Sequence, residues 1–519
     1  MNRNEMLERI KLAPDQWDFI IIGGGATGLG TAIEAAARGF ETLLLEQGDF
    51  AQGTSSRSTK LVHGGVRYLQ QGNVALVLEA LKERGLLRQN APHLVHNLPF
   101  VVPNYDWWEG PFYGVGLKLY DMLAGKHGFG TSRVLSKEKT IAAIPTIETQ
   151  GLRGGVIYFD GQFDDARLAV NMAQTADEQG GTLINYMRVE GLISREGCVR
   201  GVVARDLETD QQHELTAKGI INATGVFTDS VRRMDDPAVE AMIAPSQGVH
   251  IVLDRSFLPG DTAVMVPHTD DGRVLFATPW HDRVIVGTTD TLVEDILLEP
   301  KPMKDELAFL LSHAAKYLTK DPRPKDVLSA FAGLRPLVSL GDQENTAAIS
   351  RDHTIHIARS GLVTITGGKW TTYRKMAEDT VDQATIVAEL EERPSISKTL
   401  SIHGFHKNAK RFGNLSVYGS DAPFIQDVMR EDARFKERLH AGMNIRAGEV
   451  IWAVRHEMAR TVEDFLSRRT RALLLDARAS MAMAPKVAAL MAEALKKDAA
   501  WQKEQVAAYR QLAQGYLVM

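Results

Sequence analysis

A glycine-rich turn near the N-terminus has the spacing of a nucleotide-phosphate site. Gly23, Gly25 and Gly28 form Gly-x-Gly-x-x-Gly directly after the apolar run 19–22. The first glycine of such a motif permits a tight turn, the second lets a pyrophosphate approach the backbone, and the third lets a helix pack closely on a strand. Because the helix N-terminus presents free N–H groups and a partial positive charge, the motif predicts a dinucleotide site.

An acidic residue stands where the ribose of the same nucleotide would lie. Glu46 follows Gly23 by 23 residues and closes a second apolar run, 42–45. A carboxylate at this place can accept hydrogen bonds from both ribose hydroxyls. A glycine-rich turn is the plainer interpretation of the motif alone, but Glu46 and a helix expected over 26–38 favour dinucleotide binding.

Three further loops favour FAD over the shorter NAD. Each is rich in glycine or hydroxyl side chains, and a long cofactor can contact several such loops at once. The alternative is that each loop is an ordinary turn. The three loops are Thr54-Ser55-Ser56, His63-Gly64-Gly65 and Gly367-Gly368-Lys369.

Three arginines in glycine-rich or turn-like contexts could bind a substrate anion. Arg67 stands in HGGVRY, Arg335 in AGLRP and Arg351 in ISRDH. A phosphate dianion favours clustered arginines, because a guanidinium group binds phosphate oxygens with two parallel hydrogen bonds. For any one of them, a solvated surface residue or an ion pair is the alternative.

The elements that must position these residues alternate between strand and helix at the N-terminus. Residues 18–46 have the pattern strand, turn, helix, strand, which favours a parallel sheet. Short strand signals fill 248–290, and helices are expected over 74–90 and 303–319. After a break near 391–400 the chain is mostly helical. One buried helix face is expected from Ile451, Val454, Met458, Val462, Phe465 and Leu466.

The length and composition argue against several classes of protein, among them nucleic-acid-binding, disulfide-rich and membrane-spanning proteins. A length of 519 residues exceeds one hydrophobic core, so two or three domains are expected. The net charge of −5 shows no basic excess, so no nucleic-acid partner is expected. Cys198 is the single cysteine, which argues against a disulfide or a cysteine-rich metal site, and we predict no metal. No run of about 18 apolar residues occurs, so membrane contact would be peripheral.

Seven motifs, in one order, resemble those of FAD-dependent glycerol-3-phosphate dehydrogenase, within the wider D-amino-acid-oxidase-like flavoenzymes. The resemblance spans 15–380 and continues more loosely through 459–471. Val66 and Trp370 are mild departures. The motifs are TSSRSTKLVHGGVRYL (54–69), FDGQFDDARL (159–168), INATG (221–225), IVGTTD (285–290), FAGLRPL (331–337), ISRDH (349–353) and TGGKWTTYRKMAED (366–379).

The fold class that follows is α/β. Residues 16–390 are expected to form an FAD-binding dinucleotide fold with an interleaved antiparallel substrate domain, and 391–519 an α-helical C-terminal domain. The implied cofactor is FAD. Its expected contacts are Gly23, Gly25, Ala26, Thr27, Gly28, Glu46, Thr54, Ser55, Ser56, His63, Gly64, Gly65, Ala223, Gly225, Gly333, Gly368, Lys369 and Thr371.

The resemblance also implies the reaction. sn-Glycerol 3-phosphate would be oxidised to dihydroxyacetone phosphate by hydride transfer to flavin N5, and the electrons would pass to membrane quinone. Arg335 would stabilise the developing alkoxide-like charge, and His250 is the expected base. The expected substrate contacts are Arg67, Tyr68, His250, Arg335, Arg351 and Lys369.

Three of these side chains also have plainer interpretations. Lys369 precedes Thr371 and Thr372, which look like the N-cap region of a helix over 372–384; it could stabilise a reduced flavin or be a surface lysine. His250 could be a core histidine, since its neighbours are apolar. His63 could simply organise the flavin loop.

Other functions remain open at this point. A glycerol-3-phosphate oxidase would have the same pocket with oxygen as the acceptor. An amine or amino-acid oxidase would need one arginine for a carboxylate. A redox-silent FAD-binding protein would keep the fold without the chemistry.

The resemblance implies a protein of the cytoplasm that binds peripherally to the inner face of the cytoplasmic membrane. A homodimer is the oligomeric state to test. The candidate contact with the lipid bilayer surface is 105–123, which contains Trp107, Trp108, Phe112 and Tyr120. Trp and Tyr favour the headgroup boundary, although the same aromatics could pack inside the substrate domain.

Overall fold

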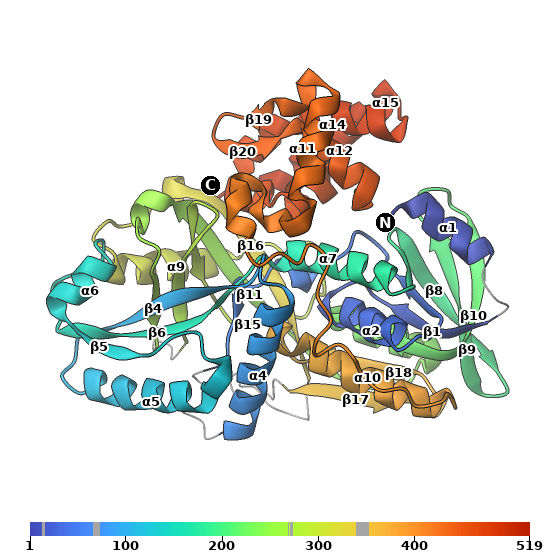
Figure 1. Cartoon of the computed structure of the whole chain (residues 1–519), viewed down its shortest axis with the longest axis horizontal. Helices are drawn as coiled ribbons and strands as arrows, with labels where there is room; N and C mark the ends of the chain where they lie inside the picture. Colours follow the sequence, from blue (N-terminus) through green and yellow to red (C-terminus); the bar gives the residue numbers. More distant parts are fainter. Residues whose placement is uncertain (13–15, 66–72, 268, 270–272, 339–351, 519) are drawn as a thin grey trace.

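The computed structural model describes residues 1–12, 16–65, 73–267, 269, 273–338 and 352–518. Two sheets lie side by side, and the C-terminal helices lie above them in the view of Figure 1. The chain passes between the two sheets several times, so neither sheet is one continuous stretch of sequence. Arg67, Tyr68 and Arg351 lie outside the described residues.

The first sheet has the order β17-β18-β10-β1-β2-β7, and it is called the parallel sheet because the five strands from β18 to β7 run parallel. Strand β17 pairs antiparallel with β18, and β9 and β8 extend from β10 by antiparallel pairing. Its core strands read as continuous apolar runs because helices cover both faces. The helix predicted over 26–38 is α2, Ala26–Ala37. The strands are β1 (Trp17–Ile22), β2 (Thr42–Leu45), β7 (Thr182–Ile184), β8 (Met187–Arg195), β9 (Cys198–Asp206), β10 (Gln212–Asn222), β17 (His353–Ile357) and β18 (Val363–Gly367).

The second sheet is antiparallel apart from the pairing of β12 with β4. Its order is β15-β11-β14-β13-β12-β4-β6-β3, while β16 pairs with β11 and β5 with β6. These strands are β3 (Leu61–Val62), β4 (His96–Asn104), β5 (Arg133–Ser136), β6 (Gly154–Gln162), β11 (Ile243–Asp254), β12 (Ala263–Val266), β13 (Leu275–Trp280), β14 (Arg283–Gly287), β15 (Thr291–Leu292) and β16 (Val327–Val338).

Helices flank both sheets at the predicted places. The helix expected over 74–90 is α4, and the one expected over 303–319 is α9. Together the sheets and helices confirm the predicted α/β class with an interleaved antiparallel part. The helices of this part are α1 (Arg3–Lys11), α4 (Val74–Asn90), α5 (Glu109–Ala124), α6 (Lys137–Ala143), α7 (Asp165–Glu178), α8 (Thr228–Asp235), α9 (Lys304–Tyr317) and α10 (Tyr373–Val387).

The C-terminal segment is helical as predicted, with one small two-stranded sheet. The domain boundary at 391 stays a prediction; α10 ends at Val387 and the next α-helix begins at Ala422. The elements are α11 (Ala422–Glu431), β19 (Arg438–His440), β20 (Met443–Arg446), α12 (Ala447–His456), α13 (Ala472–Leu475), α14 (Ala477–Leu495) and α15 (Ala499–Gln514).

One prediction for this segment was wrong. The six apolar residues expected on one helix face are all buried, but α12 ends at His456 and Met458 has a positive φ of 54°. A separate π-helical turn, Asp464–Arg469, follows. The break turns Arg468 and Arg469 toward the parallel sheet, where both pair with the buried carboxylate of Asp49.

Buried ion pairs fasten the C-terminal helices to the rest of the molecule. Arg469 donates two hydrogen bonds to Asp49, of 2.7 and 2.8 Å, and Arg471 lies 3.0 Å from Asp165 at the start of α7. Burial would raise the pKa of the Asp49 carboxyl, but the charges and hydrogen bonds of Arg469 and Arg468 hold it below its ordinary value. Such buried pairs are costly to break singly, so the C-terminal helices are expected to unfold together with the parallel sheet.

Candidate functional site

A cavity of about 620 Å³ lies between the two sheets. The loops after β1, β2, β10 and β18 line one side of it, and side chains from β11, β13 and β16 line the other. Loops predicted from separate parts of the sequence therefore meet here. The predicted residues that line the cavity are Gly23, Gly25, Ala26, Thr27, Glu46, Thr54, Ser55, His63, Gly65, Ala223, Gly225, His250, Gly333, Arg335, Gly368, Lys369 and Thr371.

Three of the predicted contacts, Gly28, Ser56 and Gly64, lie behind the cavity wall instead. A Cβ at Gly28 would lie 1.9 Å from the carbonyl oxygen of Gly23, so this glycine serves the close packing of α2. The carbonyl oxygen of Ser56 accepts hydrogen bonds from Lys60 and Arg471. Gly28 and Ser56 therefore support the cavity wall from behind through packing and hydrogen bonds.

The glycine turn has the geometry that its sequence predicts. Gly23 has a φ of +109°, and a Cβ there would lie 2.7 Å from the carbonyl oxygen of Ala223, directly after the neighbouring strand β10. The first residue of α2 is Ala26, whose N–H donates to the Ser55 hydroxyl at 2.9 Å. The helix N-terminus therefore faces the cavity, as binding of a dinucleotide phosphate requires.

Glu46 stands at the end of β2 with both carboxylate oxygens engaged. One accepts the N–H of Gly24 at 2.6 Å and the other the N–H of Gly48 at 2.7 Å. Burial raises the pKa of Glu46, and the two backbone hydrogen bonds oppose this effect. Each oxygen keeps a further lone pair, so the carboxylate can still accept ribose hydroxyls.

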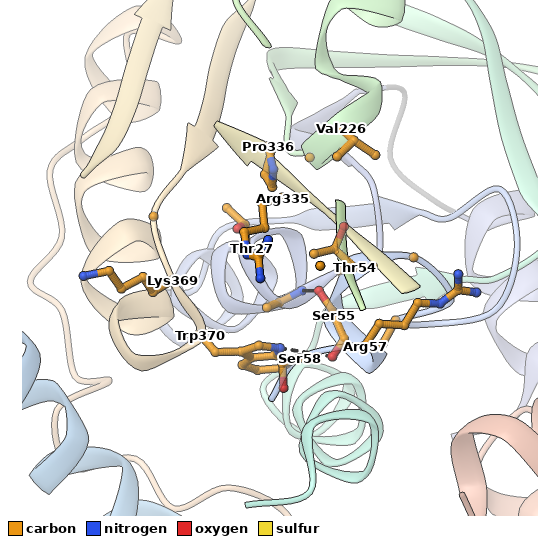
Figure 2. A pocket seen from close by; sticks show the side chains of 18 of the residues that line it. Thr27, Thr54, Ser55, Arg57, Ser58, Val226, Arg335, Pro336, Lys369 and Trp370 are labelled. Carbon is orange, nitrogen blue, oxygen red and sulfur yellow. Dashed lines mark hydrogen bonds between the residues drawn. The ribbon is translucent and has the colours of Figure 1, made fainter. Parts of the chain in front are cut away.

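The loop 54–60 joins the parts of the wall to one another. The Trp370 indole donates to the Ser55 carbonyl oxygen at 3.0 Å, and the Thr54 hydroxyl donates to the Leu334 carbonyl oxygen at 2.6 Å. Figure 2 shows Trp370 beside the backbone that carries Ser55. A glycine turn, a helix N-terminus and an acidic group on one cavity are the donors and acceptors that FAD requires, so these residues fit the cofactor.

Thr371 does not cap the following helix. The N-cap of α10 is Thr372, whose side chain makes no capping hydrogen bond. The Thr371 hydroxyl instead accepts the His63 N–H at 3.2 Å and lies 3.4 Å from the His63 carbonyl oxygen. This link holds the loop 63–65 against the loop after β18.

Lys369 also lines the cavity, although Figure 2 shows its side chain extending away from Trp370.

His250 lies on β11, and it is both a buried histidine and a residue of the cavity lining, so the two interpretations of its sequence context both apply. It is 2% exposed, yet it lines the cavity. Its Nε2 lies 3.0 Å from the Thr59 hydroxyl, and its ring stacks on Phe331 with centroids 4.9 Å apart. Burial, with the charges of Lys60 and Arg335 nearby, holds the pKa of His250 well below its ordinary value. The imidazole is therefore neutral at physiological pH.

Arg335 lies on β16, opposite Ser246 of β11. Its guanidinium donates to an oxygen of Asp290 at 3.2 Å and to the Thr288 hydroxyl at 3.0 Å. The side chain is 25% exposed, so it retains access to the cavity. The IVGTTD motif thus holds the guanidinium at the cavity wall.

Sequence reasoning missed further residues of the wall. Thr59 sits inside the recognised motif TSSRSTKL, and its contact with His250 depends on the fold. Arg273 lines the cavity just before β13, and its place after Gly272 in DDGRVL is the signal that could have indicated it. Lys60 does not line the cavity but lies behind its wall, buried against Asp165 at 2.6 Å, and burial lowers its pKa to about 7.

Comparisons with known proteins agree with this geometry. Residues 18–374 match the family model described as FAD dependent oxidoreductase, and residues 363–504 match the C-terminal domain of alpha-glycerophosphate oxidase. These matches bear out the predicted fold class and FAD.

Named relatives share much of the sequence, and the two mitochondrial ones are longer than this chain. Mitochondrial glycerol-3-phosphate dehydrogenase of Rattus norvegicus is 40% identical, over 92% of this chain and 71% of the relative. The mitochondrial enzyme SDP6 of Arabidopsis thaliana is 39% identical, over 95% and 85%. The crystal structure of glycerol-3-phosphate dehydrogenase from Bacillus halodurans, complexed with FAD, superposes with a TM-score of 0.81 at 30% identity, over 99% of this chain and 97% of that one.

Proposed function

The chain belongs to the FAD-dependent oxidoreductases, within the glycerol-3-phosphate dehydrogenases, and from this membership we propose that it oxidises sn-glycerol 3-phosphate to dihydroxyacetone phosphate. The observation that carries the proposal is the meeting of a dinucleotide turn with Arg335 and His250 on one cavity. An arginine suits a phosphorylated, hydroxyl-bearing substrate, and a neutral imidazole can accept a hydroxyl proton.

The roles of the chain's own residues follow from their surroundings. FAD, when bound, supplies the acceptor for the hydride of the substrate C2–H. Arg335 binds the substrate and stabilises negative charge on the C2 oxygen, because Asp290 and Thr288 fix its guanidinium at the wall. His250 accepts the hydroxyl proton, and Thr59 orients its ring. Arg67 and Arg351 remain the proposed partners of the substrate phosphate, and Tyr68 and Lys369 remain proposed substrate contacts.

One assay tests this function against its rivals. Glycerol 3-phosphate is added anaerobically to the FAD-loaded protein, and the flavin absorbance near 450 nm is followed. We expect bleaching, followed by reoxidation with a quinone analogue and only slow reoxidation in air. Rapid reoxidation in air would favour the oxidase. Bleaching by an amino acid alone would favour the amino-acid oxidase. No bleaching by either would favour a redox-silent protein.

The proposed quinone acceptor is lipid-soluble, so we further propose that the protein contacts the inner face of the cytoplasmic membrane. Within the described residues, no helix is long and apolar enough to cross a membrane. Helix α5 supports peripheral contact, since Val115 and Met122 are 73% and 77% exposed while Tyr113 and Leu117 are buried. The preceding Trp107 is 78% exposed. Such an apolar face suits insertion at a lipid interface.

Liposome co-sedimentation tests the membrane contact. We expect the FAD-loaded protein to sediment with liposomes and a Trp107→Ser, Trp108→Ser, Phe112→Ser variant to remain largely in the supernatant. A matched control is Phe424→Ser, since Phe424 is also exposed but lies on α11 in the C-terminal part. A folded triple variant that sediments like wild type would contradict the proposal. Sedimentation equilibrium in detergent tests the proposed homodimer separately.

A further inference from the structure

Helix α5 reaches the cavity wall on its buried side through one hydroxyl group. The N–H of Gly64 donates to the hydroxyl oxygen of Tyr120 at 2.8 Å. Tyr120 is 1% exposed, and the residues on either side of Gly64, His63 and Gly65, line the cavity. We propose that Tyr120 is a positioning residue for the reaction, acting through the loop 63–65. This inference rests on the proposed function.

The Tyr120 hydroxyl has a fixed direction. It donates to one oxygen of Asp160 at 2.9 Å, and Asp160 is paired through its other oxygen with Arg84 of α4. Burial raises the pKa of Tyr120 well above its ordinary value, so the phenol keeps its proton. Because that proton is directed to Asp160, a lone pair of the oxygen is left for the Gly64 N–H. The charge pair thus orients the acceptor that the loop requires.

The packing around Gly64 makes this contact specific. A Cβ at Gly64 would lie 2.5 Å from the Tyr120 hydroxyl and 2.5 Å from a methyl group of Leu81. Only a glycine backbone can therefore approach the hydroxyl so closely. Gly64 itself does not line the cavity. The requirement for glycine at this position of HGG therefore comes from the packing of Leu81 of α4 and Tyr120 of α5 against it.

The loop is fastened on two sides. Thr371 accepts the His63 N–H at 3.2 Å on the side of α10, and Tyr120 accepts the Gly64 N–H on the side of α5. With Tyr120 alone removed, one buried N–H loses its acceptor, and the loop must shift to find another. The substrate would then have to restore the original wall on binding. The expected consequence is weaker substrate binding with FAD retained.

Tyr120→Phe removes only the hydroxyl, and Tyr113→Phe is its matched control. Tyr113 is buried on the same helix, but its hydroxyl makes no hydrogen bond within the described part of the chain. Both FAD-loaded variants are mixed anaerobically with glycerol 3-phosphate in a stopped-flow spectrometer. The apparent dissociation constant and the limiting rate of flavin reduction are measured, with the melting temperature alongside.

We expect Tyr120→Phe to raise the apparent dissociation constant roughly tenfold, with a smaller fall in the limiting rate, and Tyr113→Phe to match wild type. A lower melting temperature with unchanged constants would overturn the proposal, because the role would then be structural only. If Tyr120→Phe does not hold FAD, Arg84→Lys replaces it: a rise of about threefold is expected, and no rise would overturn the proposal. Failure of the wild-type flavin to bleach would instead refute the proposed function.

Discussion

The two sides of the cavity are built in different ways. On the parallel sheet, backbone turns and a helix N-terminus shape the wall: the turn at Gly23, the first residues of α2 and the loop after β18. On the antiparallel sheet, side chains of separate strands form it, chiefly His250 on β11 and Arg335 on β16. One side therefore depends on local backbone shape and the other on strand register.

This difference explains how much of the site the sequence could predict. The turn, its helix and Glu46 lie within 24 residues of one another, and their spacing alone fixes the geometry. The register places Arg335 opposite Ser246, which is four positions from His250, and it is set by pairing across 89 residues of chain. No local pattern encodes such a pairing, so the residues of this side were identified by resemblance.

The same limit appears outside the site. The alternating and helical patterns predicted α2, α4 and α9 to within two residues at each end. The periodicity of 451–466 predicted burial correctly but missed the end of α12 at His456. What decides that break is the pairing of Arg468 and Arg469 with Asp49, which is more than 400 residues away in the chain. Hydrophobic periodicity carries no information about such a partner.

The largest expected effect is on the backbone-built side. In Gly28→Ala, the new Cβ would lie 1.9 Å from the backbone oxygen of Gly23. Overpacking costs about 1–3 kcal/mol even where side chains can yield, and here the obstacle is backbone. We expect a protein without FAD and without activity, measured by flavin absorbance after gel filtration. Gly116→Ala on α5 is the control, since no atom lies within 4 Å of its Cβ. A yellow, active Gly28→Ala variant would contradict this account.

On the side-chain-built side, His250→Asn should leave the cofactor in place. The neutral imidazole is the proposed proton acceptor, and a general base contributes about 10²–10⁴-fold to the rate. We expect anaerobic flavin reduction to slow by that factor with FAD content unchanged. The buried His93→Asn, on a histidine outside the cavity lining, is the control. Reduction within about threefold of wild type would make His250 a core histidine only.

Arg335→Leu should have a smaller effect, on substrate binding and on the reaction rate together. A charge-assisted hydrogen bond contributes about 1.5–3 kcal/mol, so KM should rise at least roughly tenfold, and kcat should fall if the guanidinium meets the reacting hydroxyl. The control is Arg205→Leu, an arginine that pairs with Glu190 on the outer strands β8 and β9. Steady-state kinetics with a quinone analogue measure both constants. Unchanged kinetics would place the substrate anion elsewhere.

The smallest expected effect is a pH dependence that differs between the two sides. His250 has a pKa well below its ordinary value, so it stays neutral and the reduction rate should not fall between about pH 8 and 6 through its protonation. Glu46 has a raised pKa, so its carboxylate takes up a proton at a higher pH than an ordinary glutamic acid. A protonated Glu46 loses acceptor capacity for the ribose hydroxyls.

FAD affinity, measured by flavin fluorescence, should therefore weaken as the pH falls on the acidic side of neutrality, before the reduction rate of the remaining holoenzyme changes. Glu46→Gln is the matched variant. It should bind FAD more weakly at pH 7, because an amide offers the ribose hydroxyls one acceptor oxygen in place of two. Its FAD affinity should not depend on pH through this position, because an amide does not take up a proton. An affinity that falls equally in Glu46→Gln would assign the effect to another group. A reduction rate that falls with a midpoint near pH 6.5 would mean that His250 titrates as an exposed histidine does, and the side-chain-built wall would then be open to water.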